Sequence, residues 1–237
     1  MDFRNVNKNY QSGGIAAGAV SYDAGLRAYM LRVYNYMSIA LLLTGGVALG
    51  ASMSPDLMQM IHGTALRWVV ALAPLGVVIY LSARMHSMSV SQAQMWFWVF
   101  SGIMGLSLSY IFIAYTGASV ARTFFVTSAT YGALSLYGYT TKKSLTGMGT
   151  FLFMGLIGVI IAGLVNMFLQ SPGLQFAISA LGVVIFAGLT AYDTQRIKDS
   201  YAMGGASEHI AIMGALSLYL NFINLFVSLL RLMGDRR

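Results

Sequence analysis

The residues best suited to do chemistry lie in the last two apolar segments of the chain. Ala187–Lys198 reads AGLTAYDTQRIK and carries Asp193, the only carboxylate inside a long apolar run. A carboxylate at membrane depth can exchange a proton or bind a cation, and its ionisation is costly unless it is paired. We therefore expect Asp193 to act as a gate. The alternative is a helix-end carboxylate that Arg196, one turn further on, holds in headgroup water.

The final segment, Ile210–Arg231, carries small and polar residues at steps of three and four. These residues are Gly214, Ser217, Asn221, Asn224 and Ser228. On a helix this spacing gives one stripe, and the surrounding Leu, Ile, Phe and Val predict that the stripe turns away from lipid. The stripe is then a helix seam or part of a pore. The two asparagines are either cation ligands or interhelical hydrogen-bonding groups, typically worth about 0.6–2 kcal/mol each.

The composition identifies a membrane protein. Of the 237 residues, 57% are hydrophobic and 9% are charged, whereas a soluble domain carries roughly a quarter charged residues. The net charge of +7 does not indicate a nucleic-acid partner, because most basic residues flank apolar segments, where membrane topology requires them. The partner that we expect is the lipid bilayer, with the protein a monomer or a weak homo-oligomer.

The apolar segments predict an all-α bundle of seven transmembrane helices in residues 29–237, with the last helix inside it. Each segment approaches the ~20 residues that a bilayer requires. Residues 1–28 are polar and are expected to form a flexible cytoplasmic tail. The predicted spans are residues 37–53, 66–83, 95–115, 120–139, 148–169, 174–194 and 210–232.

The distribution of Lys and Arg predicts the orientation. With seven spans, nine of the 14 basic residues fall on the side of the N-terminus and five on the other side, which places the N-terminus in the cytoplasm. The basic C-terminus does not fit this pattern. If the last segment entered the membrane and returned, the split would be twelve to two. We favour seven full spans because the last segment is long enough to cross, and the re-entrant arrangement is the alternative.

The same topology brings three of the candidate residues into relation. Arg84 ends the second span and Asp193 lies near the end of the sixth, so both are expected at the cytoplasmic boundary. At ~1.5 Å per residue, Asn221 lies roughly 12–16 Å from that boundary and reaches Asp193 only if the last helix starts late or tilts. Protonation of Asp193, or loss of a contact with Arg84, would then release one helix from another.

Signatures of enzymes and resident metals are absent from the sequence. There is no phosphate-binding Gly-rich loop, no HExxH motif, no nucleophile elbow and no pair of membrane carboxylates, so we do not expect an enzyme. The three histidines fall in three separate loops and there is no cysteine, so no cofactor is expected. Asp193 and Asn221 are the only weak candidates for a metal ligand, and Ca²⁺ is considered only as a permeant ion.

Two long motifs resemble the Bax inhibitor-1 family. They are AYDTQRIK at Ala191–Lys198 and LSLYLNFINLFVSLLRL at Leu216–Leu232, and LRAYMLRVYNYM at Leu26–Met37 is similar to the proteobacterial branch. The likeness covers nearly the whole chain. It implies a seven-helix fold in the bacterial inner membrane, with the last helix surrounded by the other six. Family members are described as pH-sensitive calcium-leak channels, and a bacterial relative moderates the membrane protease FtsH.

The resemblance also implies roles for particular residues. The family's proposed pH sensor is an aspartate pair on the last two helices, with an arginine at the end of the second span as a latch. Asp193 matches the first aspartate and Arg84 matches the arginine by position, but Asn221 occupies the second aspartate position. An Asp–Asn pair has one titrating group, and it has a weaker hold on calcium than two carboxylates.

Two functions follow from these observations. The first is a cation leak channel, with Ca²⁺ as the candidate ion, that Asp193 gates under the influence of pH. The second is a membrane-embedded modulator of a protease such as FtsH, in which the polar N-terminal tail carries the function without transport.

Overall fold

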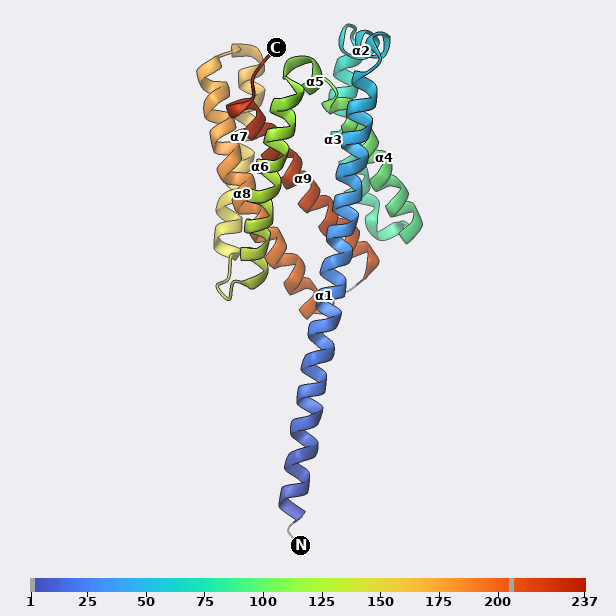
Figure 1. Cartoon of the computed structure of the whole chain (residues 1–237), viewed down its shortest axis with the longest axis vertical. Coiled ribbons are helices and arrows are strands. Elements are labelled where there is room, and N and C mark those ends of the chain that lie inside the picture. Colours follow the sequence, from blue (N-terminus) through green and yellow to red (C-terminus); the bar gives the residue numbers. More distant parts are fainter. Residues whose placement is uncertain (1–2, 205–206) are drawn as a thin grey trace.

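The computed structural model describes residues 3–204 and 207–237, with side chains from Ala24 onward except for His86. In this part of the chain the fold is all-α, as predicted, and its only β-type pairing is one isolated bridge between Tyr115 and Arg236 (Figure 1). The helices are α1 (Phe3–Ser52), α2 (Pro55–His62), α3 (Leu66–Arg84), the 3₁₀ turn η1 (Met85–Ser87), α4 (Val90–Leu108), α5 (Ile111–Ala114), α6 (Gly117–Thr140), α7 (Thr146–Leu169), α8 (Pro172–Ala202) and α9 (Glu208–Met233).

Seven of these helices are long enough to cross a bilayer, which confirms the predicted bundle. Among the described residues, six segments are also apolar enough: part of α1, α3, α4 with α5, α7, α8 and α9. The seventh, α6, has 24 residues and a length of ~36 Å, but it is rich in hydroxyl groups. Its polar residues Ser119, Thr123, Thr127 and Ser135 are buried, so its inner face is polar and its overall hydropathy is low.

The last helix lies at the centre of the bundle, as predicted. Two thirds (67%) of the most apolar window of α9 is buried, against 11% for α3 and for α7. α9 packs on α8, α1, α6 and α4, whereas α3 packs mainly on α4 and α7 mainly on α8. The outer helices expose large apolar side chains such as Phe151 and Phe168, which is expected of surfaces that face lipid.

The last helix also crosses the bundle completely. It runs obliquely from the end where α1 leaves the bundle to the opposite end, so the two termini lie at opposite ends (Figure 1). Beyond α9 the chain pairs with the α5–α6 connection: the Thr116 amide donates to the Asp235 carbonyl at 3.1 Å and the Arg237 amide to the Ala114 carbonyl at 3.1 Å. The re-entrant arrangement is therefore not what the structure adopts.

Several predicted boundaries are shifted. The segment expected to be a flexible tail is helical from Phe3, and residues 3–52 contain no proline that would interrupt the helix. Residues 1–2, and all side chains before Ala24, lie outside the described part. α8 continues to Ala202 instead of ending at residue 194. Arg196 and Lys198 are compatible with a continuing helix, because their long side chains can place the charged groups in water. The connection between the predicted spans at residues 37–53 and 66–83 contains the short helix α2, which Ser54 caps and Pro55 starts.

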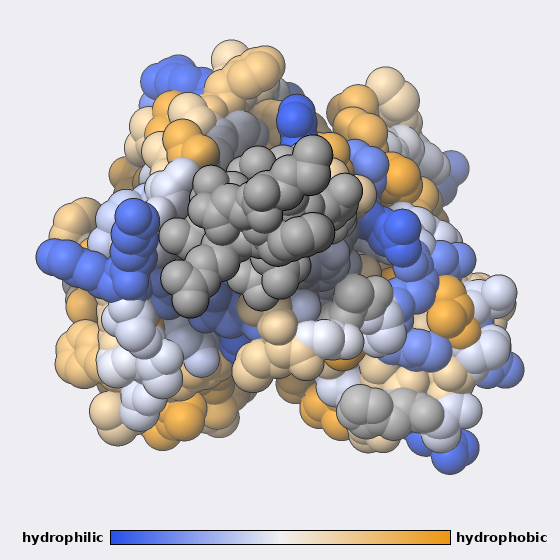
Figure 2. Space-filling model, turned by 90° about the horizontal axis from the view of Figure 1, so that it is seen from below, coloured by the Kyte–Doolittle hydropathy of each residue, from blue (hydrophilic) through white to orange (hydrophobic). Residues whose placement is uncertain are grey.

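The end of the bundle at which α1 leaves it carries many hydrophilic residues (Figure 2). Arg27, Arg32, Lys142 and Lys143 are exposed there. The opposite end carries Arg67, Arg122 and the basic C-terminus. The positions of these groups follow the split of charges that the seven-span topology predicts.

Candidate functional site

Asp193 lies inside the bundle rather than at its edge. The residue is 4% exposed. Because α8 continues for nine residues beyond it, the carboxylate lies ~14 Å from the end of its helix. The alternative is therefore right about the contact with Arg196 but wrong about exposure to water, because the carboxylate itself is buried.

The two oxygens of Asp193 have different environments. Asn221 Nδ2 on α9 donates a 2.8 Å hydrogen bond to Oδ2. Arg196 Nη2 lies 3.0 Å from Oδ1 as an ion pair, but the angles are not those of a hydrogen bond, and Oδ1 has no hydrogen-bond donor among the described residues. The Arg196 side chain is 45% exposed, lies over the Tyr192 ring and donates to Ser217 Oγ at 3.3 Å.

Asn221 reaches Asp193 because one of the two conditions stated for that contact, a tilt of the last helix, is met: α9 runs obliquely through the bundle (Figure 1). The other condition, a late start, is not met, since α9 begins at Glu208. The two helices run antiparallel and form the most extensive helix pair of the bundle. The hydrogen bond from Asn221 to Asp193 therefore lies within the main helix–helix contact of the protein.

The stripe on α9 is largely the seam with α8. A β-carbon on Gly214 would lie 3.1 Å from Ile197, and a β-carbon on Gly182 would lie 2.7 Å from Ser228 Oγ. Ser217 meets α8 through Arg196. Asn224 is the exception, because its Nδ2 donates to the Leu220 carbonyl of its own helix at 2.8 Å.

Arg84 is not brought to Asp193. It is exposed at the end of α3 and forms no ion pair with any residue whose side chain the structure describes. The reason is positional, because α3 packs on α4 while α8 packs on α9, α6 and α7. The cation beside Asp193 is instead Arg196 of the same helix.

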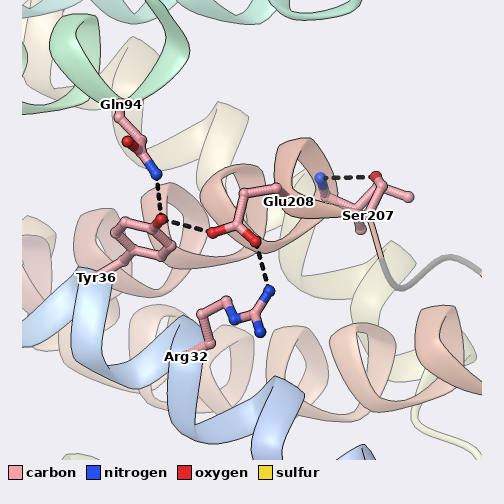
Figure 3. Close-up of polar contacts among 6 residues, drawn as sticks. Arg32, Tyr36, Gln94, Ser207 and Glu208 are labelled. Atoms are coloured by element: carbon pink, nitrogen blue, oxygen red, sulfur yellow. Dashed lines mark hydrogen bonds and ion pairs between the residues drawn. The ribbon is translucent and has the colours of Figure 1, made fainter. Parts of the chain in front are cut away.

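A second polar cluster, which the sequence interpretation did not find, joins α1, α4 and α9 (Figure 3). The Glu208 carboxylate accepts from Arg32 Nη1 and from Tyr36 Oη, both at 2.6 Å, and Gln94 Nε2 donates to Tyr36 Oη. Ser207 caps α9 beside it through the Ile210 amide. The sequence contained a signal, since residues 32 and 36 are one helical turn apart and Ser-Glu is a typical helix start.

The described residues contain no group of three His, Cys, Asp or Glu side chains that could hold a metal ion. The side chains in polar contact with Asp193 are an amide and a guanidinium, those of Asn221 and Arg196, whereas Ca²⁺ normally takes six to eight oxygen ligands. The arrangement is therefore suited to transient contact with a cation or to exchange of a proton.

The comparisons with known proteins agree with this fold. The family model described as "Inhibitor of apoptosis-promoting Bax1" matches residues 26–237. The inner membrane protein YbhL of Escherichia coli is 46% identical over 221 residues, which are 90% of this chain and 94% of that protein. An uncharacterized protein of Rickettsia prowazekii is 49% identical over 92% of this chain and 93% of its own length. A membrane protein of Streptococcus pyogenes is 31% identical over 90% and 94%. The chain is therefore a membrane protein that belongs to the Bax inhibitor-1 family.

Proposed function

We propose that the protein is an inner-membrane leak channel for cations, with Ca²⁺ as the permeant ion, and that Asp193 controls its opening. The observation that carries the proposal is the buried Asp193 carboxylate in the α8–α9 seam, whose Oδ1 has no hydrogen-bond donor among the described residues. An ionisable group in a membrane span is costly, and its retention at the centre of a bundle is typical of ion and proton pathways.

The contacts of Asp193 correspond to a closed state. Asn221 holds one carboxylate oxygen, and the positive charge of Arg196 lies beside the other, where it repels a cation. Protonation of the carboxylate removes the charge that Arg196 pairs with, and an unpaired cation then moves toward water. The seam between α8 and α9 then loses the hydrogen bond from Arg196 to Ser217, and the hydrogen bond from Asn221 weakens because its acceptor is no longer charged, so we expect the seam to open.

The location and orientation are part of the same proposal. The E. coli relative is named an inner membrane protein, and we assign this chain to the same membrane. We assign the end where α1 leaves the bundle, and with it the N-terminus, to the cytoplasm, and the exposed cations at that end support this assignment.

The test is flux from liposomes that contain a calcium-sensitive dye. The wild-type protein is expected to pass Ca²⁺ faster at pH 6 than at pH 8, and Asp193→Ala is expected to leak at a rate that no longer depends on pH. Asp235→Asn is the control, because this carboxylate pairs with Arg122 at the far end of the bundle, 64% exposed. Flux no greater than that of empty liposomes from pH 6 to 8, or an unchanged pH profile in Asp193→Ala, would reject the proposal.

A protein without flux would instead fit the modulator of a membrane protease such as FtsH. Deletion of residues 1–25 separates the two functions. A channel keeps its flux after this deletion, whereas a modulator that acts through its N-terminal segment loses co-purification with the protease.

A further inference from the structure

A large groove lies on the side of the bundle, between α1 and α6. Its volume is about 890 Å³, and Phe222 of α9 contributes to its lining. Leu31 and Leu42 of α1 and Leu136 of α6 also line it and are each more than half exposed. The groove therefore opens sideways, toward the region that lipid occupies around a membrane protein.

The walls of this groove consist mainly of apolar side chains and glycines. Gly45, Gly46 and Gly132 line it, and a β-carbon on any of them would meet no atom within 4 Å. Three of the hydroxyl groups in its walls already donate within the protein: Tyr34 Oη to Ser135 Oγ at 3.0 Å, Tyr131 Oη to the Leu218 carbonyl at 3.3 Å, and Ser128 Oγ to the Phe124 carbonyl at 2.8 Å. A polar ligand would gain little here, whereas an aliphatic chain would bury its surface.

One end of the groove is positively charged. Arg27 lines that end, is exposed, and forms no ion pair with any carboxylate whose side chain the structure describes. Tyr139 lines the groove near the end of α6, and Lys198 Nζ donates to its carbonyl at 2.8 Å and lies 5.8 Å from the centre of its ring. An apolar channel with cations at one end matches a molecule with an anionic head and a long apolar tail.

We propose that this groove binds one acyl chain of an anionic phospholipid, with the lipid phosphate on Arg27. The stretch from Arg27 to Gly46 is 19 residues of α1, or ~28 Å, close to the ~30 Å thickness of the hydrocarbon core. One lipid chain along this stretch therefore lies parallel to the lipids around it. A transmembrane helix of another protein fits less well, because a cylinder ~10 Å wide and ~28 Å long occupies roughly 2,200 Å³, more than the groove contains.

The experiment is native mass spectrometry of the full-length protein in detergent, titrated with dioleoyl phosphatidylglycerol or dioleoyl phosphatidylcholine. The wild-type protein is expected to retain one phosphatidylglycerol in preference to phosphatidylcholine. Gly132→Leu fills the groove where a side chain meets no neighbour, and it is expected to weaken the binding of either lipid at least about tenfold, because the leucine displaces several methylene groups. Arg27→Gln is expected to abolish the preference for phosphatidylglycerol while the chain still binds.

Two variants serve as matched controls. Gly163→Leu makes the same substitution on α7, also in open space, and Arg67→Gln removes a cation at the far end of the bundle. Both are expected to bind lipid as the wild type does, and thermal unfolding confirms that every variant is folded. Equal retention of phosphatidylglycerol by the wild type and Gly132→Leu would overturn the proposal. A shift from dimer to monomer in Gly132→Leu would also overturn it, because a second copy of the chain would then be the occupant.

Discussion

Gly138 on α6 lies directly on the backbone of Ala191 on α8, two residues before Asp193. A β-carbon at position 138 would be 2.9 Å from the Ala191 carbonyl carbon and 3.0 Å from its Cα, closer than such atoms normally approach. Small residues at helix crossings allow this kind of contact in membranes. The contact fixes the position of α8 along α6, next to the candidate site.

Gly138→Ala is expected to destabilise the protein, because the obstacle is backbone and cannot rotate away. Overpacking of this kind typically costs about 1–3 kcal/mol, which we expect to measure as a lower midpoint of thermal unfolding in detergent. Gly132→Ala on the same helix is the control, since its new β-carbon meets nothing within 4 Å. That variant should gain up to about 1 kcal/mol from helix propensity. Equal effects of the two substitutions would contradict the contact.

Asn221→Asp is expected to make stability depend on pH. It places a second carboxylate at the 2.8 Å contact with Asp193, and two carboxylates at that distance cannot both ionise cheaply. At pH 8 the unfolded chain ionises both, so the folded state should lose about 3 kcal/mol relative to wild type. The loss should shrink as the pH falls and the pair takes up a proton. Asn224→Asp adds the same charge away from Asp193, and a similar pH profile in that variant would refute the prediction.

Glu208→Gln is expected to weaken the attachment of α9 to α1. The change removes the ion pair with Arg32 and replaces the carboxylate that accepts from Tyr36 with a neutral amide; both contacts are 2.6 Å in the wild type. Because the Glu208 side chain is 23% exposed, we expect a loss of about 1 kcal/mol in the free energy of unfolding. Asp235→Asn breaks an ion pair with Arg122 in which both side chains are more than half exposed, and it should change stability by less. The reverse order of the two effects would count against this cluster as an anchor.

His62 is expected to make the protein less stable in acid. Burial lowers the pKa of its imidazole, at the end of α2, below the ordinary value. The unfolded chain then binds the proton more readily, so stability falls as the pH drops through the ordinary pKa of about 6.5. His62→Gln should reduce this dependence in unfolding experiments between pH 8 and 5, and His209→Gln serves as the comparison. An unchanged slope in His62→Gln would show that other groups are responsible.

The sequence predicted the elements that depend on long apolar runs. The all-α bundle followed from the hydrophobicity of the segments. The inward position of the last helix followed from the spacing of Gly214, Asn221 and Ser228, because small and polar residues of a membrane helix face the protein interior rather than lipid. The encounter of Asp193 with Asn221 was predicted as conditional on the tilt of the last helix, and the oblique path of α9 supplies that condition.

The sequence did not predict features that depend on where helices end and which helices are neighbours. Arg84 and Asp193 were expected in one leaflet, but a linear charge count contains no information about which helices pack together. The Glu208 cluster joins residues more than 170 positions apart, and only the fold brings them into contact. The end of α8 was predicted at residue 194 but lies at Ala202, because long cationic side chains such as Arg196 and Lys198 reach water from inside a helix.

The central position of α9 has a consequence for biosynthesis. This helix is the last to leave the ribosome, yet α1, α4, α6 and α8 all pack on it. Until translation terminates, the inward faces of those four earlier helices have only one another or lipid to contact. A chain that stops before Glu208 therefore lacks the helix on which the other four pack. We expect such truncated products to be substrates for membrane quality control rather than partly active proteins.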